Sequence, residues 1–161
     1  MPHEGALYID QAWRFILSGG GLYNNLDYSF TSDYEQGNWS IPETNPGWGG
    51  VSFREKLSVL VETINLVPFQ EMEFSGTILG TSNEELKQYG LQKEGEIYLL
   101  FVENLMEAEL IPRVPRSSYE VSFINVDTGD KNTETVNLGN EQAITSPFTG
   151  DRVAVMIRIS E

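Results

Sequence analysis

Apolar residues recur at helical spacing in the first part of the chain. Residues 9–17 show a three-to-four spacing, which predicts a helix with one buried face and Trp13 in the core. The apolar positions are Ile9, Ala12, Trp13, Ile16 and Leu17. Three glycines at 19–21 end this helix, and because they follow a helix we expect a left-handed cap rather than a phosphate-binding loop.

A second helical pattern covers residues 52–67. Ser52 and Glu55 have the spacing of a capping box at its start, and Pro68 marks its end. The apolar positions behind the box are Phe53, Leu57, Leu60, Val61 and Ile64. Between the two helices, residues 22–28 alternate as a short strand does.

From about residue 73 the pattern changes to short strands separated by turn residues. We expect strands at residues 96–102, 119–126, 133–138 and 152–159. Strands in succession without helical patterns between them predict an antiparallel β-sandwich. The alternation in residues 152–159 predicts one buried face and one partly wet face. The fold class is therefore α+β, with a first domain over residues 1–72 and a second over 73–161.

The segment between the helices, Leu22 to Val51, is long for a connection inside a compact domain. Such connections are usually functional or disordered. Its many rings argue against disorder, because disordered linkers are normally depleted in aromatic residues. The rings belong to Tyr23, Tyr28, Phe30, Tyr34, Trp39 and Trp48.

Composition narrows the range of functions. With 10 basic and 24 acidic residues, the 161-residue chain carries a formal net charge of −14, so it should repel nucleic acid and anionic membranes. It has no cysteine, which excludes disulfides and thiolate metal sites. The single histidine, His3, cannot supply a two-histidine metal site. We expect no cofactor and no metal. The first residues lack the features of a signal peptide.

Two blocks of sequence resemble a known family. QAWRFILSGGG at 11–21 and YNNLDYSFT at 23–31 resemble the end of the (β/α)₈ barrel in bacterial cellulase-like glycoside hydrolases. Those proteins continue into a C-terminal β-sandwich of the collagen-binding type. Here FINVDTG at 123–129 and DRVAV at 151–155 are similar to that module. The resemblance implies that the segments at 9–17, 22–28 and 52–67 are the seventh helix, eighth strand and eighth helix of a barrel.

The resemblance also implies site residues. The long loop would follow the C-terminal end of a barrel strand, where barrel enzymes place their active sites. Related barrel enzymes carry a nucleophilic glutamate at the end of the seventh strand, where Glu4 would stand; the alternative, which we favour, is a flexible N-terminal glutamate. We expect Asp27, Tyr28, Trp39 and Trp48 to be substrate-binding residues, with rings that stack on sugars.

Other acidic residues have simpler interpretations. Asp33 and Glu35 could bind sugar hydroxyls, but solvated acids are the better interpretation. A second acidic group lacks the spacing of a calcium loop, and its first residues make a good hairpin turn. That group is Asp127, Asp130, Asn132 and Glu134.

These observations predict a C-terminal portion of a glycoside hydrolase. One strand and two helices cannot close a barrel, so the isolated chain should lack activity. The alternative is a non-catalytic carbohydrate-binding or protein-interaction module, with a row of rings on the sandwich at Tyr98, Phe101, Tyr119 and Phe123. A further partner would be the missing barrel portion or a second copy, covering the apolar helix faces. The sequence leaves the location open, although the parent family is often secreted.

Overall fold

The computed structural model describes residues 4–24, 26–42, 48–80, 85–105, 109–139 and 141–160, without the side chains of residues 4–6. Two helices, α1 (Glu4–Leu17) and α2 (Val51–Asn65), precede a short 3₁₀ helix, η1 (Phe69–Glu71). The strands are β1 (Glu73–Phe74), β2 (Leu79–Gly80), β3 (Lys87–Lys93), β4 (Ile97–Glu103), β5 (Ile111–Pro112), β6 (Ser117–Ile124), β7 (Lys131–Leu138) and β8 (Arg152–Ile159). The prediction of an α+β fold with antiparallel strands is confirmed.

Helix α1 begins earlier than its apolar pattern suggested and ends where predicted. The Gly19 amide donates to the Ile16 carbonyl, and the Gly20 amide donates to the Phe15 carbonyl, both at 3.0 Å. With Gly19 at a φ of 90°, these bonds form the left-handed Schellman cap that the glycine run predicted. The predicted face is buried, and Trp13 stacks on Phe101 with ring centroids 5.6 Å apart.

Helix α2 differs from its sequence pattern at its start. It begins at Val51 with Gly50 as N-cap and without a capping bond from a side chain, so the predicted Ser52–Glu55 capping box is wrong. Its buried residues include Val59 and Thr63, whereas Val61, predicted to be buried, is 59% exposed. The helical period was correct, but Val61 lines an open groove beside α1, whereas Val59 packs in the core that the helices share with the sheet.

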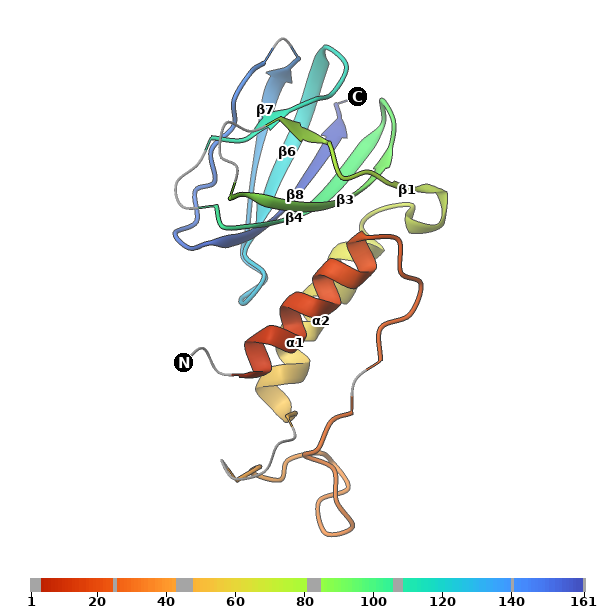
Figure 1. Cartoon of the computed structure of the whole chain (residues 1–161), viewed down its shortest axis with the longest axis vertical. Coiled ribbons are helices and arrows are strands. Elements are labelled where there is room, and N and C mark those ends of the chain that lie inside the picture. Colours follow the sequence, from red (N-terminus) through yellow and green to blue (C-terminus); the bar gives the residue numbers. More distant parts are fainter. Residues whose placement is uncertain are drawn as a thin grey trace.

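The strands form one large sheet and one small one. The six-stranded sheet has the order β1-β3-β4-β8-β6-β7, and β2 pairs with β5 in a separate two-stranded sheet. Strands β4 and β8 are paired in register, with Phe101 opposite Ala154 and Leu99 opposite Met156. Figure 1 shows the helix pair lying below this sheet, with the long loop extending away from it.

Both faces of the central strands are buried, which corrects the prediction of a partly wet face for residues 152–159. Val153, Val155 and Ile157 enter a core on the β2–β5 side of the sheet. Ala154 and Met156 enter a second core that the sheet shares with α1 and α2. The four rings considered as an exposed row, Tyr98, Phe101, Tyr119 and Phe123, are at most 1% exposed. These rings stabilise the interior and are closed to a ligand.

Other strand predictions divide into confirmed and wrong ones. Strands β4, β6, β7 and β8 match the predicted strands to within about two residues, the usual uncertainty of element ends. Strand β3 was missed because its sequence is mostly polar. Gly90 within it leaves room for the Ile78 side chain, whose Cδ1 would lie 2.7 Å from a Cβ added at Gly90. The predicted strand at 22–28 is wrong, since residues 22–24 and 26–28 have no strand structure. A strand needs a hydrogen-bonded neighbour, and the chain here runs beside helices.

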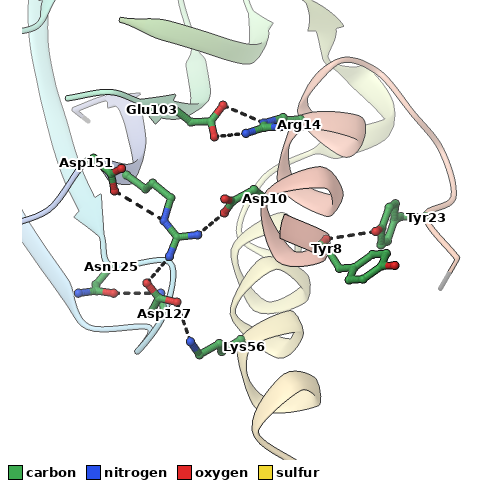
Figure 2. A network of polar contacts seen from close by, with 10 residues as sticks. Tyr8, Asp10, Arg14, Tyr23, Lys56, Glu103, Asn125, Asp127 and Asp151 are labelled. Carbon is green, nitrogen blue, oxygen red and sulfur yellow. Dashed lines mark hydrogen bonds and ion pairs between the residues drawn. The ribbon is translucent and has the colours of Figure 1, made fainter. Parts of the chain in front are cut away.

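Ion pairs connect residues of the helices with residues of the sheet and its turns (Figure 2). Arg14 of α1 donates two hydrogen bonds to Glu103 at the end of β4, at 2.8 and 2.5 Å. Arg152, at the start of β8, pairs with Asp10 of α1 and, at 2.6 Å, with Asp127 in the turn after β6. Burial opposes ionisation of Asp127, but Lys56 and Arg152 outweigh it and hold the pKa of Asp127 below its ordinary value. The helices are thus joined to the sheet by both apolar packing and charge pairing.

Candidate functional site

The long loop begins by running back along the helix pair. Figure 1 shows α1 and α2 pointing in the same direction, with the connecting segment returning in the opposite one. Tyr23 on this segment packs against Phe15 of α1, with ring centroids 6.1 Å apart. Its hydroxyl donates to the Tyr8 carbonyl at 3.1 Å (Figure 2), and burial raises the pKa of Tyr23. The first loop residues are therefore anchored to α1.

Asp27 is the next anchor. Its Oδ1 accepts hydrogen bonds from the Ser29 amide at 2.9 Å and from the Gly50 amide at 3.0 Å. Its Oδ2 pairs with Nη1 of Arg54 at 2.5 Å. Burial alone would raise the pKa of Asp27, but the hydrogen bonds from Ser29, Arg54 and Gly50 outweigh it and lower that pKa. Asp27 therefore satisfies the N-terminal end of α2, in the role that the Ser52 capping box was predicted to have.

Arg54 holds a second part of the loop. Its Nη2 donates to the Gly37 carbonyl at 2.9 Å, and its guanidinium lies 5.1 Å from the centroid of the Phe30 ring. The Ser29 hydroxyl, fully buried, lies 2.7 Å from the same Gly37 carbonyl and 2.6 Å from Asp27. Gly37 has a φ of 67°, and a Cβ added there would meet Phe30 at 2.5 Å. Arg54 therefore contacts the loop through Asp27, Phe30 and the Gly37 carbonyl.

The same arrangement brings together the aromatic residues expected to bind substrate. The Tyr28 amide donates to the Trp48 carbonyl at 3.0 Å, and the Trp39 amide donates to the Ser29 carbonyl at 3.2 Å. Tyr28 is exposed, whereas Trp39 and Trp48 are half-buried. A tight turn from Thr31 to Tyr34 carries a further exposed ring.

The predicted carboxylates are placed differently from one another. Both oxygens of Asp27 are engaged inside the loop, and its side chain is 17% exposed. Asp33 and Glu35 are exposed, as expected for solvated acids. Glu4 is the first residue of α1, and its side chain lies outside the described residues.

The sequence analysis missed Arg54, although the sequence contained a signal for it. Residues 22–51 contain four acids and no lysine or arginine, and Arg54 is the first basic residue after them.

An apolar groove lies between the two helices and the returning segment. It has a volume of about 390 Å³. Leu22 on its rim is 79% exposed, and Val61 on α2 is 59% exposed. The lining residues that carry its apolar character are Ala12, Ile16, Tyr23, Leu57, Leu60 and Ile64. This surface has the composition of a protein interior, although solvent reaches it.

The described residues show neither a cluster of metal ligands nor a membrane-spanning helix. Among them, no three acids or histidines converge as a metal site would require. The Asp127 turn closes on itself, with the Asn125 amide donating to the Asp130 carbonyl at 2.8 Å. Neither of the helices among the described residues combines the length and apolarity needed to cross a membrane.

The fold has counterparts among glycoside hydrolases. One solved structure, described as "Glycoside hydrolase", aligns with a TM-score of 0.57 at 9% identity, over 74% of this chain and 30% of the other. A glycoside hydrolase family 5 protein from Bacteroides vulgatus aligns with a TM-score of 0.55 at 8% identity, over 67% and 24% of the two chains. No family model matches the sequence, and no curated protein matches it. At such identities the likeness shows the fold, and this chain spans less than a third of either structure's length.

Proposed function

We propose that this chain is the C-terminal portion of a glycoside hydrolase. Residues 1–72 would supply part of a carbohydrate-binding active-site wall, and residues 73–161 an accessory β-sandwich of the kind found beside such barrels. The observation that carries this proposal is the open apolar groove on a pair of parallel helices. The likeness to parts of two glycoside hydrolases supports it.

We infer that the groove corresponds to the surface that a barrel's strands would cover. In a (β/α)₈ barrel, each helix covers the strand layer with its apolar face. Successive helices are parallel, and the strand between them runs in the opposite direction. Here the chain after Leu22 runs back beside the parallel helices towards the start of α2, in the direction that the strand of such a unit would take. A parallel strand needs neighbours on its edges. The exposed Leu22 and Leu26 are the side chains that those neighbours and the barrel interior would cover.

The aromatic loop supports a carbohydrate ligand. Rings of tyrosine and tryptophan offer apolar faces with a polar edge, which suits the alternating faces of a sugar. Tyr28, Trp39 and Trp48 come from three separate parts of the loop and are linked by backbone hydrogen bonds. The loop reaches the N-terminal end of α2, which in a barrel is the face that carries the active site.

Catalysis would need groups from outside this chain. Retaining glycosidases use two carboxyl groups on either side of the scissile bond. Glu4 remains the candidate for one, as nucleophile, and the second would come from the missing barrel portion. The isolated chain should therefore bind sugars weakly and turn over none.

The test is a hydrolysis assay on the purified chain with 4-nitrophenyl β-glycosides. We expect no release of nitrophenol above buffer. Turnover that is lost in Glu4→Gln and kept in the exposed-helix control Glu62→Gln would refute the proposal that the chain is incompetent alone. The reading frame immediately upstream gives an independent check, since we expect it to encode the missing barrel portion.

The second candidate is a carbohydrate-binding module without catalysis. The sheet rings are buried, so this function is favoured by exposed rings of the loop, among them Tyr28 and Tyr34. Glycan binding by the isolated chain that survives removal of those two rings would show that they are not the binding site of such a module. Sedimentation addresses the protein-interaction version, in which the groove pairs with a second copy.

A further inference from the structure

We propose that Arg54 is the positioning residue of the aromatic loop. This inference rests on the proposed function only for the purpose of the loop. If the loop binds sugar, Arg54 holds the aromatic rings that bind it in position. Asp27 then serves as the anchor for Arg54, and a ligand meets the aromatic residues instead of this carboxylate.

Arg54, on α2, contacts the loop at three points on either side of the Thr31–Tyr34 turn. It pairs with Asp27 at the beginning, receives the face of Phe30, and donates to the Gly37 carbonyl beyond the turn. A guanidinium can make these contacts together because it is planar, permanently charged and rich in donors. A lysine at the same place would present a single point charge.

The residues held by Arg54 are the ones that carry the exposed and half-buried rings. Tyr28 follows Asp27 directly, and its amide ties the backbone of Trp48 into the same unit. Trp39 is two residues beyond Gly37, and its amide returns to Ser29, which also contacts Arg54 at 3.2 Å. Loss of Arg54 therefore removes the side chain that joins the Asp27 segment, next to Tyr28, to the Gly37 segment, next to Trp39.

Asp27 is closed to a ligand by the same contacts. Its oxygens accept from two backbone amides and from Arg54. A sugar hydroxyl would have to displace a charge-assisted hydrogen bond to reach it, and such bonds are about twice as strong as neutral ones. We therefore expect Asp27→Asn to act on the loop in the way that Arg54 variants do.

The experiment follows the three tryptophan indole N–H signals by NMR in the full chain. Trp39 and Trp48 report on the loop, and the fully buried Trp13 reports on the core. Arg54→Met should displace or broaden both loop signals and leave Trp13 in place. Arg54→Lys should restore them in part. Arg116→Met, at an exposed position between β5 and β6, is the matched control and should change none of the three.

A cellohexaose titration in the same samples separates this inference from the proposed function. We expect Arg54→Met to weaken binding about tenfold or more, the size of effect expected when hydrogen bonds to a charged group are lost. Failure of the wild-type chain to bind cellohexaose, with the loop signals still displaced by Arg54→Met, would count against the sugar-binding function and support the positioning role.

Two results would overturn the positioning role itself. One is loop signals in Arg54→Met that match those of Arg116→Met. The other is loss of the Trp13 signal to the same extent as the loop signals in Arg54→Lys, because Arg54 would then support the whole fold.

Discussion

Deletion of residues 1–72 should unfold the remaining sheet, although those residues belong to the first of the two predicted domains. The deletion removes α1 and α2, which cover one face of the six-stranded sheet. Five large apolar side chains on that face are at most 3% exposed in the full chain and would meet water. They are Leu91, Leu99, Phe101, Ile124 and Met156.

The size of the effect follows from burial. A fully buried apolar side chain of this kind contributes about 1.5–3 kcal/mol relative to an exposed one. For the five together the loss is on the order of 10 kcal/mol. That is comparable with the whole stability of a domain, which is about 5–15 kcal/mol. Residues 73–161 alone should therefore lack a cooperative unfolding transition.

Thermal unfolding followed by circular dichroism, with binding of a hydrophobic dye, measures this directly. We expect a broad or absent transition and strong dye binding for residues 73–161. Trp13→Ala in the full chain is the graded version, because it removes the ring that stacks on Phe101. It should cost about 3–5 kcal/mol. A truncated protein that melts cooperatively within a few degrees of the full chain, without dye binding, would refute the reasoning.

Three further predictions concern charges and backbone. Arg152→Met should cost about 2–4 kcal/mol in urea unfolding, because the buried Asp10 would lose its ion-pair partner and Asp127 would keep only Lys56; no change in the midpoint would contradict this. Gly49→Ala should disorder the loop in limited proteolysis, since its Cβ would lie 1.8 Å from Oδ1 of Asp27, whereas Gly21→Ala, with open space around it, should not. Asp27 and Asp127 have lowered pKa values, so the stability they contribute is present at neutral pH and is lost as the pH falls below about 4; Asp127→Asn should flatten that acid loss.

The local patterns of the sequence predicted much of the fold. The apolar spacing at 9–17 identified α1 and its buried face, and the glycines after it identified the cap. Strands β4, β6 and β8 were found because dense β-branched and aromatic runs are typical of buried strands. Strand β3 was missed because neighbours, rather than its own polar residues, make it a strand.

Predictions failed where an outcome depended on a distant partner. The start of α2 is held by Asp27, whose side chain accepts from an amide 23 residues along the chain, so the local Ser52 box had no part in it. The segment at 22–28 alternates as a strand does but has helices beside it. For the candidate site, the sequence located the rings, and Arg54 was overlooked because its pair with Asp27 spans 27 positions.

The sequence by itself determined the type of most elements, the apolar faces of the helices and the acidic, aromatic character of the loop, because these depend on residue identity and short-range spacing. Tertiary structure decided which strands are buried on both faces, as β8 is through Ala154 and Met156 on its second face. It also decided which carboxylates form ion pairs, as Asp27 does with Arg54. The physical reason is that burial and ion pairing are properties of two surfaces brought together. A pattern along one segment describes only one of them.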